Sequence, residues 1–255
     1  MHRLRVALSV VLLMLAGTSP RAETVVRAFG PGGPAPAMKE AADIFGKRSN
    51  VTVDVVAGPT NEWLGKAKSE ADVIYSGSEV MMTDFVTAMA GQIAEETVTP
   101  LYLRAAAVLV RPRNPKNIRG LSDLFTRDLK VLVVNGAGQQ GLWEDVAGRM
   151  GDIAKVKALR SKIVEFAPNS AAARKTWIER PDIDAWIIWT IWQVSNSSLA
   201  DLVEIEPEYR IYRDTGIALT RRGQANTAAK EFIAFLQSSE GAAIFRKWGW
   251  IAGTP

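Results

Sequence analysis

The feature that most constrains this chain is a repeated unit in which a short β-rich run ends at a turn of small residues and a helix follows at once. Such a turn places free backbone N–H groups and the positive end of a helix dipole at the carboxyl edge of a strand. Open α/β sheets bind small polar or anionic ligands at this edge. The four turns therefore predict a ligand cleft. The units are Val25–Phe29 before Gly30–Gly33, Val53–Val56 before Gly58–Asn61, Val73–Tyr75 before Ser76–Ser78, and Val131–Val134 before Asn135–Gly138.

The first 22 residues have the composition of a secretory signal. Arg3 and Arg5 give a basic start, and the apolar run Val6–Ala16 follows. The small-residue region Thr18–Ala22 comes next. The apolar run is far short of the ~20 residues that span a bilayer. We expect cleavage at the end of this segment and a periplasmic mature protein that does not span the membrane.

Loss of the signal limits the chemistry of the mature chain. Three of the 31 basic residues and none of the 27 acidic ones leave with it, so nothing in the net charge favours nucleic acid as a partner. The only histidine, His2, also leaves, and the chain has no cysteine. Histidine-containing triads, cysteine nucleophiles and zinc held by His or Cys are excluded. We expect no enzymatic activity, no metal and no cofactor.

Strands and helices alternate along most of the mature length, which predicts an α/β protein. Pro100–Pro112 and Val203–Thr220 are long extended segments. If both cross between lobes, residues 23–102 plus 214–255 form the first lobe and residues 103–213 the second, with a ligand between them. A single doubly wound sheet is the alternative. The other expected elements are helices at Gly120–Arg127, Gly141–Met150, Ser170–Ile178, Ala225–Leu236 and Ser239–Lys247, and strands at Lys162–Phe166 and Asp184–Ile188.

Five long motifs are Gly30–Met38 (GPGGPAPAM), Ala71–Phe85 (ADVIYSGSEVMMTDF), Val131–Gly148 (VLVVNGAGQQGLWEDVAG), Phe166–Arg174 (FAPNSAAAR) and Glu206–Thr220 (EPEYRIYRDTGIALT). They resemble the accessory colonization factor family of periplasmic solute-binding proteins, which have type II architecture. More distantly, the chain resembles the periplasmic molybdate-binding proteins of ABC importers. The resemblance runs from about Val25 to Trp250. It implies a two-lobed Venus-flytrap fold with two hinge strands. It also implies a non-catalytic monomer that passes a small solute to an ABC permease or a chemoreceptor.

The resemblance to the molybdate-binding proteins carries over position by position. Their first loop offers a serine where this chain has Gly33, and the serine of their second loop has Thr60 as its nearest counterpart. Backbone N–H contacts fall at Gln140 or its successor, and near Ser170. Their tyrosine hydroxyl is replaced by Trp189, whose indole N–H donates a hydrogen bond but cannot accept one. The resemblance therefore implies a similar backbone cradle with altered size and donors.

The residues themselves also favour an anion. Each helix N-terminus that converges on one point favours a negative ligand by roughly 0.3–1 kcal/mol. The alternative for each Ser, Thr or Asn is an ordinary N-cap. Arg104 and Arg213 lie in the expected hinge segments and bring positive charge to the cleft, unless they pair with an acid such as Asp214. The candidate ligand-binding residues are Gly32, Gly33, Thr60, Asn61, Ser76, Ser78, Gln139, Gln140, Asn169, Ser170 and Trp189.

The eight tryptophans suggest a second kind of ligand. Trp186, Trp189 and Trp192 fall three residues apart. Most large aromatic residues belong to the core, but a cleft lined by them favours a small organic solute. Trp250 is expected to pack the last helix onto the first lobe.

Two further interpretations remain open. Gly136–Gly141 fits the G-x-G-x-x-G dinucleotide pattern between a strand and a helix, but a lone mid-chain match is weak evidence. An adhesin or colonisation factor without a transport role is the other interpretation. An adhesin needs no closed cleft, so stabilisation by a ligand separates the two classes.

Overall fold

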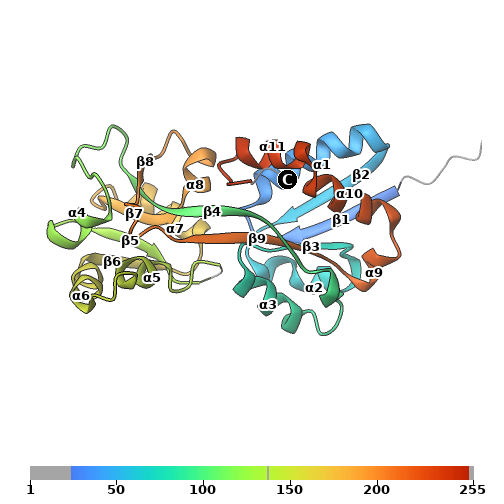
Figure 1. The fold of residues 1–255 in the computed structure, drawn as a ribbon, viewed down its shortest axis with the longest axis horizontal. Helices are drawn as coiled ribbons and strands as arrows, with labels where there is room; N and C mark the ends of the chain where they lie inside the picture. The colour runs from blue at the N-terminus through green and yellow to red at the C-terminus, as the bar shows by residue number, and fades with distance from the viewer. Residues whose placement is uncertain (1–23, 137, 253–255) are drawn as a thin grey trace, which may run out of the picture.

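The computed structural model describes residues 24–136 and 138–252. The expected export signal at residues 1–22 lies outside the described residues. Within them, no helix is long and apolar enough to cross a membrane. Figure 1 shows two lobes joined by long strands, which confirms the predicted two-lobed α/β fold.

Three strand–turn–helix units build the first lobe, as predicted. They are β1 (Thr24–Gly30) with α1 (Ala35–Ser49), β2 (Val51–Ala57) with α2 (Thr60–Glu70), and β3 (Val73–Tyr75) with α3 (Glu79–Ala88). β1 pairs in parallel with both β2 and β3, so the turns after the three strands lie at one edge of the sheet. Met38, Ala41 and Phe45 recur at helical spacing and pack α1 into the core.

Two long strands connect the lobes. A 3-10 turn at Glu95–Thr97 leads into β4 (Thr99–Val110), which pairs antiparallel with β9 (Tyr212–Leu219). Arg104 and Arg213 are opposite each other in this register. β9 also pairs with β3 of the first lobe, and Figure 1 shows β4 and β9 running side by side between the lobes. The two predicted hinge strands are confirmed, while the residue-level lobe boundaries stay a prediction.

The second lobe extends the same sheet. Its elements are α4 (Leu121–Thr126), β5 (Val131–Val134), α5 (Leu142–Gly148), α6 (Ile153–Lys162), β6 (Ile163–Ala167), α7 (Ser170–Glu179), β7 (Ala185–Trp189), α8 (Thr190–Ser195) and β8 (Asp201–Glu204). β5 pairs in parallel with β6 and β7, and β4 pairs antiparallel with β7 and β8. Over the described residues the strand order is β2-β1-β3-β9-β4-β7-β5-β6, with β8 beside β4.

Three helices were not expected from the sequence: α6, α8 and α9 (Arg221–Gln224). In α6, Leu159 is the only fully buried residue, so the sequence shows almost no amphipathic period. The other two are so short that a 3.6-residue period cannot be read from them. Local pattern alone therefore could not reveal these elements.

The extended segment expected at Val203–Thr220 is wrong as a single strand, because it breaks between β8 and β9. Pro207 lies in the break and has no N–H to donate to a strand ladder. The neighbouring Glu206 carboxylate accepts hydrogen bonds from the backbone N–H groups of Leu121 (2.7 Å) and Ser122 (3.1 Å) at the start of α4. The break thus supplies a cap for a distant helix.

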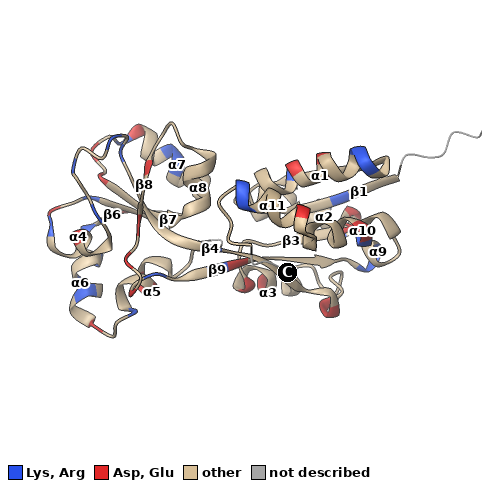
Figure 2. Ribbon diagram, turned by 45° about the horizontal axis from the view of Figure 1, so that its top comes forward, with Lys and Arg blue, Asp and Glu red and all other residues tan. Residues whose placement is uncertain are grey.

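The chain returns to the first lobe through α10 (Thr227–Gln237) and α11 (Ser239–Lys247), close to their predicted positions. Glu240 of α11 forms an ion pair with Arg48 at 2.7 Å. Trp248 donates from Nε1 to the Glu40 carboxylate at 2.7 Å. Basic and acidic residues are interspersed over both lobes in Figure 2.

Candidate ligand-binding site

A small cavity of about 120 Å³ lies where the turns of the two lobes meet. The turns after β1, β2 and β3 approach from the first lobe, and the turns after β5 and β6 approach from the second. Arg104 of β4 and Trp189 at the end of β7 also line it. The five turns contribute residues 31–34, 58–60, 77, 138–139 and 169–171. The cavity therefore lies at the carboxyl ends of strands from both lobes.

The lobes touch each other at this cavity. Gly138 has a φ of +47°, and a Cβ at this position would lie 3.2 Å from Cε of Met81 and 3.5 Å from the carbonyl oxygen of Gly77. A glycine is needed here both for the left-handed backbone and for the close approach. Arg104 donates from Nη2 to the same Gly77 carbonyl. Residues of the two lobes therefore lie in close contact beside the cavity.

Helix N-termini from both lobes point to the cavity. Gly32 and Gly33 line it just before α1 begins, and Thr60 lines it as the first residue of α2. Asn169 caps α7 by accepting a hydrogen bond from Ala172 N at 2.9 Å. The partial positive charge of each N-terminus favours a negative ligand.

Arg104 is the charged residue of the cavity wall, and its side chain is 3% exposed. Its guanidinium carbon lies 4.7 Å from the ring centroid of Trp189 and 5.1 Å from that of Trp250. Burial lowers the pKa of Arg104 to about 9, because the charged form loses its hydration, while the Asp214 carboxylate acts to raise it. The group remains a cation at neutral pH. Among the described residues, no carboxylate lies within 4.0 Å of this guanidinium.

Unpartnered polar atoms are concentrated at the cavity. Five buried side-chain polar atoms lack a hydrogen-bond partner in the described part of the chain, and three belong to the cavity residues Arg104 (Nε), Gln139 (Oε1) and Trp189 (Nε1). The other Gln139 amide atom, Nε2, donates to Oγ of Ser170 at 2.5 Å. A buried polar group without a partner costs about 1–3 kcal/mol. Such a concentration is typical of a site whose partners arrive with a ligand.

Most of the residues predicted from the sequence line this cavity. The structure brings together Gly32, Gly33, Thr60, Arg104, Gln139, Asn169, Ser170 and Trp189.

Five predicted residues lie outside the cavity lining. Ser76 Oγ accepts from Gly216 N at 3.1 Å, and Ser78 Oγ accepts from Met81 N at 3.2 Å as the cap of α3. The hinge residue Arg213 forms an ion pair with Asp145 of α5. The remaining two, Asn61 and Gln140, are exposed.

Sequence reasoning missed two parts of the site. Met81 lines the cavity from α3, where an apolar helix residue gives no sign of a ligand contact. Trp250 was expected only to pack the last helix, and it does contact Phe245 with ring centroids 5.8 Å apart. It also lies under Arg104, a contact that no local pattern indicates. Of the three spaced tryptophans, Trp189 and Trp192 line the cavity.

Solved structures of solute-binding proteins share this fold. The chain is 34% identical to PEB3 in complex with L-phospholactate, with a TM-score of 0.84 over 89% of this chain and 100% of that chain; PEB3 is a protein of Campylobacter jejuni. It is 16% identical to the sulfate-binding protein SubI of Mycobacterium tuberculosis, with a TM-score of 0.77 over 91% of this chain and 88% of that one. It is 12% identical to the periplasmic molybdate-binding protein of Azotobacter vinelandii, with a TM-score of 0.69 over 90% and 100% of the two chains.

A comparison with curated proteins found no match. A family model described as bacterial extracellular solute-binding protein matches residues 26–251, which is nearly the whole described chain. This match and the likeness to PEB3 confirm the relationship to periplasmic solute-binding proteins predicted from the motifs. The chain belongs to the bacterial extracellular solute-binding protein family.

Proposed function

We propose that this protein captures a small anion, with a tetrahedral oxyanion group such as sulfate, molybdate or a phosphoryl group, in the cavity between its lobes. The loaded, closed form then delivers the anion in the periplasm to an ABC permease or a chemoreceptor. Residues 23–102 plus 214–255 and residues 103–213 would be the lobes that close on it.

The observation that carries this proposal is that Arg104 is a buried cation without an ion-pair partner within 4.0 Å among the described residues. A buried cation is costly unless an opposite charge accompanies it. The Asp214 carboxylate acts on Arg104 only from beyond 4.0 Å, and the cavity wall itself offers neutral donors, helix N-termini and tryptophan rings. An anionic ligand supplies the missing charge, and it accepts hydrogen bonds from the guanidinium and from the indole N–H of Trp189.

The size of the cavity limits the ligand. A volume of about 120 Å³ is far below the ~300–1,000 Å³ of sites for drug-sized molecules. It suits an inorganic oxyanion or a short organic acid. L-Phospholactate, sulfate and molybdate, the ligands of the similar proteins compared above, are of this kind.

The apolar part of the wall favours a second candidate, an organic anion. Met81, Trp189 and Trp192 cover part of the cavity. These side chains suit a few carbon atoms attached to the charged group. PEB3, the more similar of the proteins compared above, was solved with L-phospholactate, which is a phosphorylated carboxylic acid.

A thermal-shift screen of the mature protein tests both candidates. One set of ligands is sulfate, molybdate, tungstate and phosphate, and the other is L-phospholactate with small carboxylates, amino acids and quaternary amines. A ligand at about 100 times its dissociation constant adds about 2.7 kcal/mol of stability and raises the melting temperature by several degrees. The protein is first unfolded, dialysed and refolded, so that a co-purified ligand cannot mask the shift.

The outcomes separate the classes of function. A shift with inorganic oxyanions supports the first candidate, and a shift with L-phospholactate or carboxylates alone supports the organic anion. Stabilisation by quaternary amines alone contradicts an anion site. If folded, ligand-free protein responds to no compound, the cleft is not a solute site and the adhesin interpretation gains support.

A further inference from the structure

Residues 248–252, which follow α11, are attached to the hinge. Leu103 N donates to the carbonyl oxygen of Ile251 at 3.1 Å, and Ile251 N donates to the carbonyl oxygen of Leu103 at 2.7 Å. The two residues thus form an antiparallel bridge directly beside Arg104. Gly249 has a φ of +83°, and a Cβ there would lie 2.9 Å from Cγ2 of Val194 in α8. This segment therefore contacts both the hinge strand and the second lobe.

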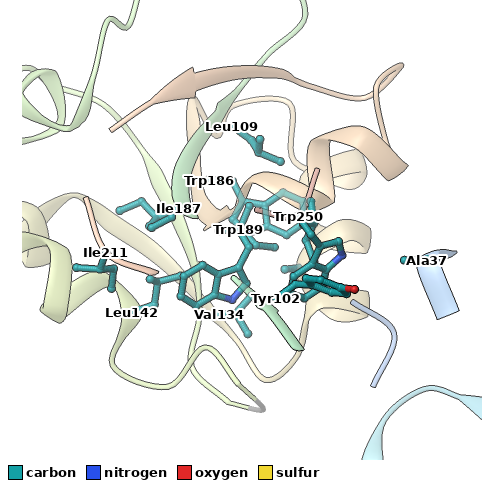
Figure 3. Close-up of a cluster of buried hydrophobic side chains, with 14 of the residues drawn as sticks. Ala37, Tyr102, Leu109, Val134, Leu142, Trp186, Ile187, Trp189, Ile211 and Trp250 are labelled. Atoms are coloured by element: carbon teal, nitrogen blue, oxygen red, sulfur yellow. The ribbon is translucent and has the colours of Figure 1, made fainter. Parts of the chain in front are cut away.

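Trp250 is the buried residue of this segment, with 3% of its surface exposed. Its ring contacts Phe245 of α11, and Phe245 in turn packs against Tyr102 at a centroid distance of 4.6 Å. Figure 3 shows Trp250, Tyr102 and Trp189 in one cluster. Tyr102 and Arg104 are two residues apart in β4 and so lie on the same face of the strand. The aromatic support beneath Arg104 is thus anchored in the first lobe.

A tryptophan ring can orient a guanidinium without using its donors. The positive group is attracted to the face of the ring, while its N–H groups lie in its own plane and remain available to an anion. An arginine side chain has many rotamers, and a ligand that must itself order this side chain binds less tightly for that reason. A contact that fixes Arg104 in the empty site therefore strengthens ligand binding.

From this geometry we infer that Trp250 is a positioning residue for the anion site, which holds the Arg104 guanidinium in place from outside the cavity. The inference rests on the proposed function, because it assigns Arg104 to the ligand. Trp250 does not line the cavity, so it acts on the ligand only through Arg104.

The test compares three variants of the mature protein, with sulfate and L-phospholactate as probes in titration calorimetry. Trp250→Leu removes the ring face, and we expect a loss of affinity of about tenfold, equivalent to about 1.4 kcal/mol. Trp250→Phe keeps a smaller ring face, and we expect it to restore most of the affinity, to within about threefold of wild type.

Trp248→Phe is the matched control. It removes an indole from the same segment and breaks the Trp248–Glu40 hydrogen bond, but that bond is made to α1 and not to Arg104. We expect it to lower the melting temperature and leave the affinity within about twofold of wild type. Circular dichroism confirms that each variant is folded before titration. Wild-type affinity in folded Trp250→Leu, or an equal loss in Trp248→Phe, overturns the inference.

A ligand-free measurement separates this inference from the proposed function. In a double-mutant cycle, Arg104→Met and Trp250→Leu are made singly and together, and urea unfolding is followed without any ligand. Non-additive effects support the contact that positions Arg104, and additive effects overturn it. If wild-type protein binds neither probe, the proposed function fails, and the cycle alone decides whether Trp250 holds Arg104.

Discussion

Arg104 in β4 and Arg111, the residue that follows β4, both lie against tryptophan rings, yet their surroundings differ. The guanidinium carbon of Arg111 lies 3.6 Å from the ring centroid of Trp177. Its three nitrogens donate to the backbone carbonyls of Ile183 (2.8 Å), Trp177 (2.9 Å) and Arg180 (2.6 Å). Every nitrogen of this guanidinium thus has a protein partner.

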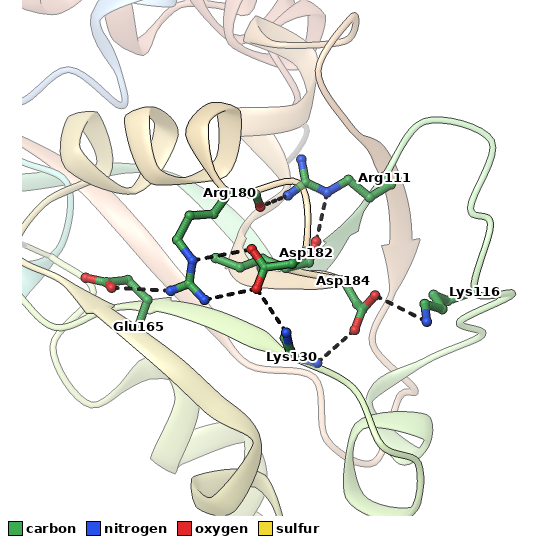
Figure 4. A network of polar contacts seen from close by, with 8 residues as sticks. Arg111, Lys116, Lys130, Glu165, Arg180, Asp182 and Asp184 are labelled. Atoms are coloured by element: carbon green, nitrogen blue, oxygen red, sulfur yellow. Dashed lines mark hydrogen bonds and ion pairs between the residues drawn. The ribbon is translucent and has the colours of Figure 1, made fainter.

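Charges also surround Arg111. Figure 4 shows it beside a network in which Asp182 contacts Arg180 and Lys130, at 3.1 and 3.0 Å. Hydrogen bonds from these two residues lower the pKa of Asp182 to about 2, so it stays ionised. Burial lowers the pKa of Arg111, and the nearby Asp184 and Asp182 carboxylates oppose this effect.

Arg104 has an incomplete set of partners, and the Asp214 carboxylate that acts on its pKa lies more than 4.0 Å from it. Its Nη2 donates to Gly77, its Nε has no partner, and it is more buried than Arg111. The tryptophans follow the same division, because Trp177 Nε1 donates to the Leu199 carbonyl at 3.0 Å while Trp189 Nε1 has no partner. A buried cation with complete partners holds a fold together, whereas one with incomplete partners is poised for a ligand.

The largest effect is expected from Arg111→Met. The substitution leaves three backbone carbonyls without their donor, and we expect a loss of about 3 kcal/mol in the free energy of unfolding. Urea unfolding of the ligand-free protein measures it. Ligand affinity of the folded variant should match wild type. A stability loss below about 1 kcal/mol would show that the carbonyls find water instead.

Arg104→Met should show the reverse pattern, with a large loss of ligand affinity and little change in stability. We expect a loss of about 100-fold in affinity for the preferred anion, equivalent to about 2.8 kcal/mol, because a charge-assisted contact disappears. Without ligand, the free energy of unfolding should change by less than about 1 kcal/mol, because removal of an incompletely partnered buried charge offsets the loss of the hydrogen bond to Gly77. Calorimetry and urea unfolding check the two parts. An affinity equal to that of wild type would contradict the assignment of Arg104, rather than Arg111, to the ligand.

A smaller effect separates the two tryptophans. Trp177→Phe and Trp189→Phe remove the same atoms, but only the first breaks a hydrogen bond. We expect Trp177→Phe to be the less stable by about 1 kcal/mol in thermal unfolding. Only Trp189→Phe should weaken ligand binding, because the indole N–H of Trp189 belongs to the cavity wall. Equal affinity losses in the two variants would contradict this assignment.

The smallest effect is expected from Arg213→Gln. Arg213 faces Arg104 in the sheet register, but its ion pair with Asp145 is partly exposed on both sides, at 35% and 43%. Solvent screens such pairs, so we expect less than about 0.5 kcal/mol in stability. Ligand affinity should stay within about twofold of wild type. A large loss of affinity would mean that Arg213 shares the role of Arg104.

The turns were predictable because parallel strands end at one edge of a sheet. Gly32, Gly33 and Thr60 follow strands that the sequence marks clearly, and they line the cavity. Finer placement failed for a geometric reason, since consecutive residues of a helix point about 100° apart. Thr60 therefore lines the cavity while Asn61, the next residue of α2, is exposed.

Ser76 and Ser78 show a different limit. Their turn follows a clear strand, β3. However, β9 lies beside this strand, and its Gly216 N–H donates a hydrogen bond to the Ser76 hydroxyl. β9 is far away in the sequence, so local pattern could not reveal that the hydroxyl already has a partner. Serine before a helix has the same appearance whether it caps the helix or binds a ligand.

The sequence by itself determined the α/β class and the edge of the sheet at which the cavity lies. These features follow from local periodicity and turn chemistry, which act over neighbouring residues. Only the tertiary structure decided which arginine has partners and which is left for a ligand. Arg104 meets Gly77, Trp189 and Trp250 from three distant parts of the chain. Whether a buried charge has partners depends on such distant residues, because burial and pairing arise only when the chain has folded.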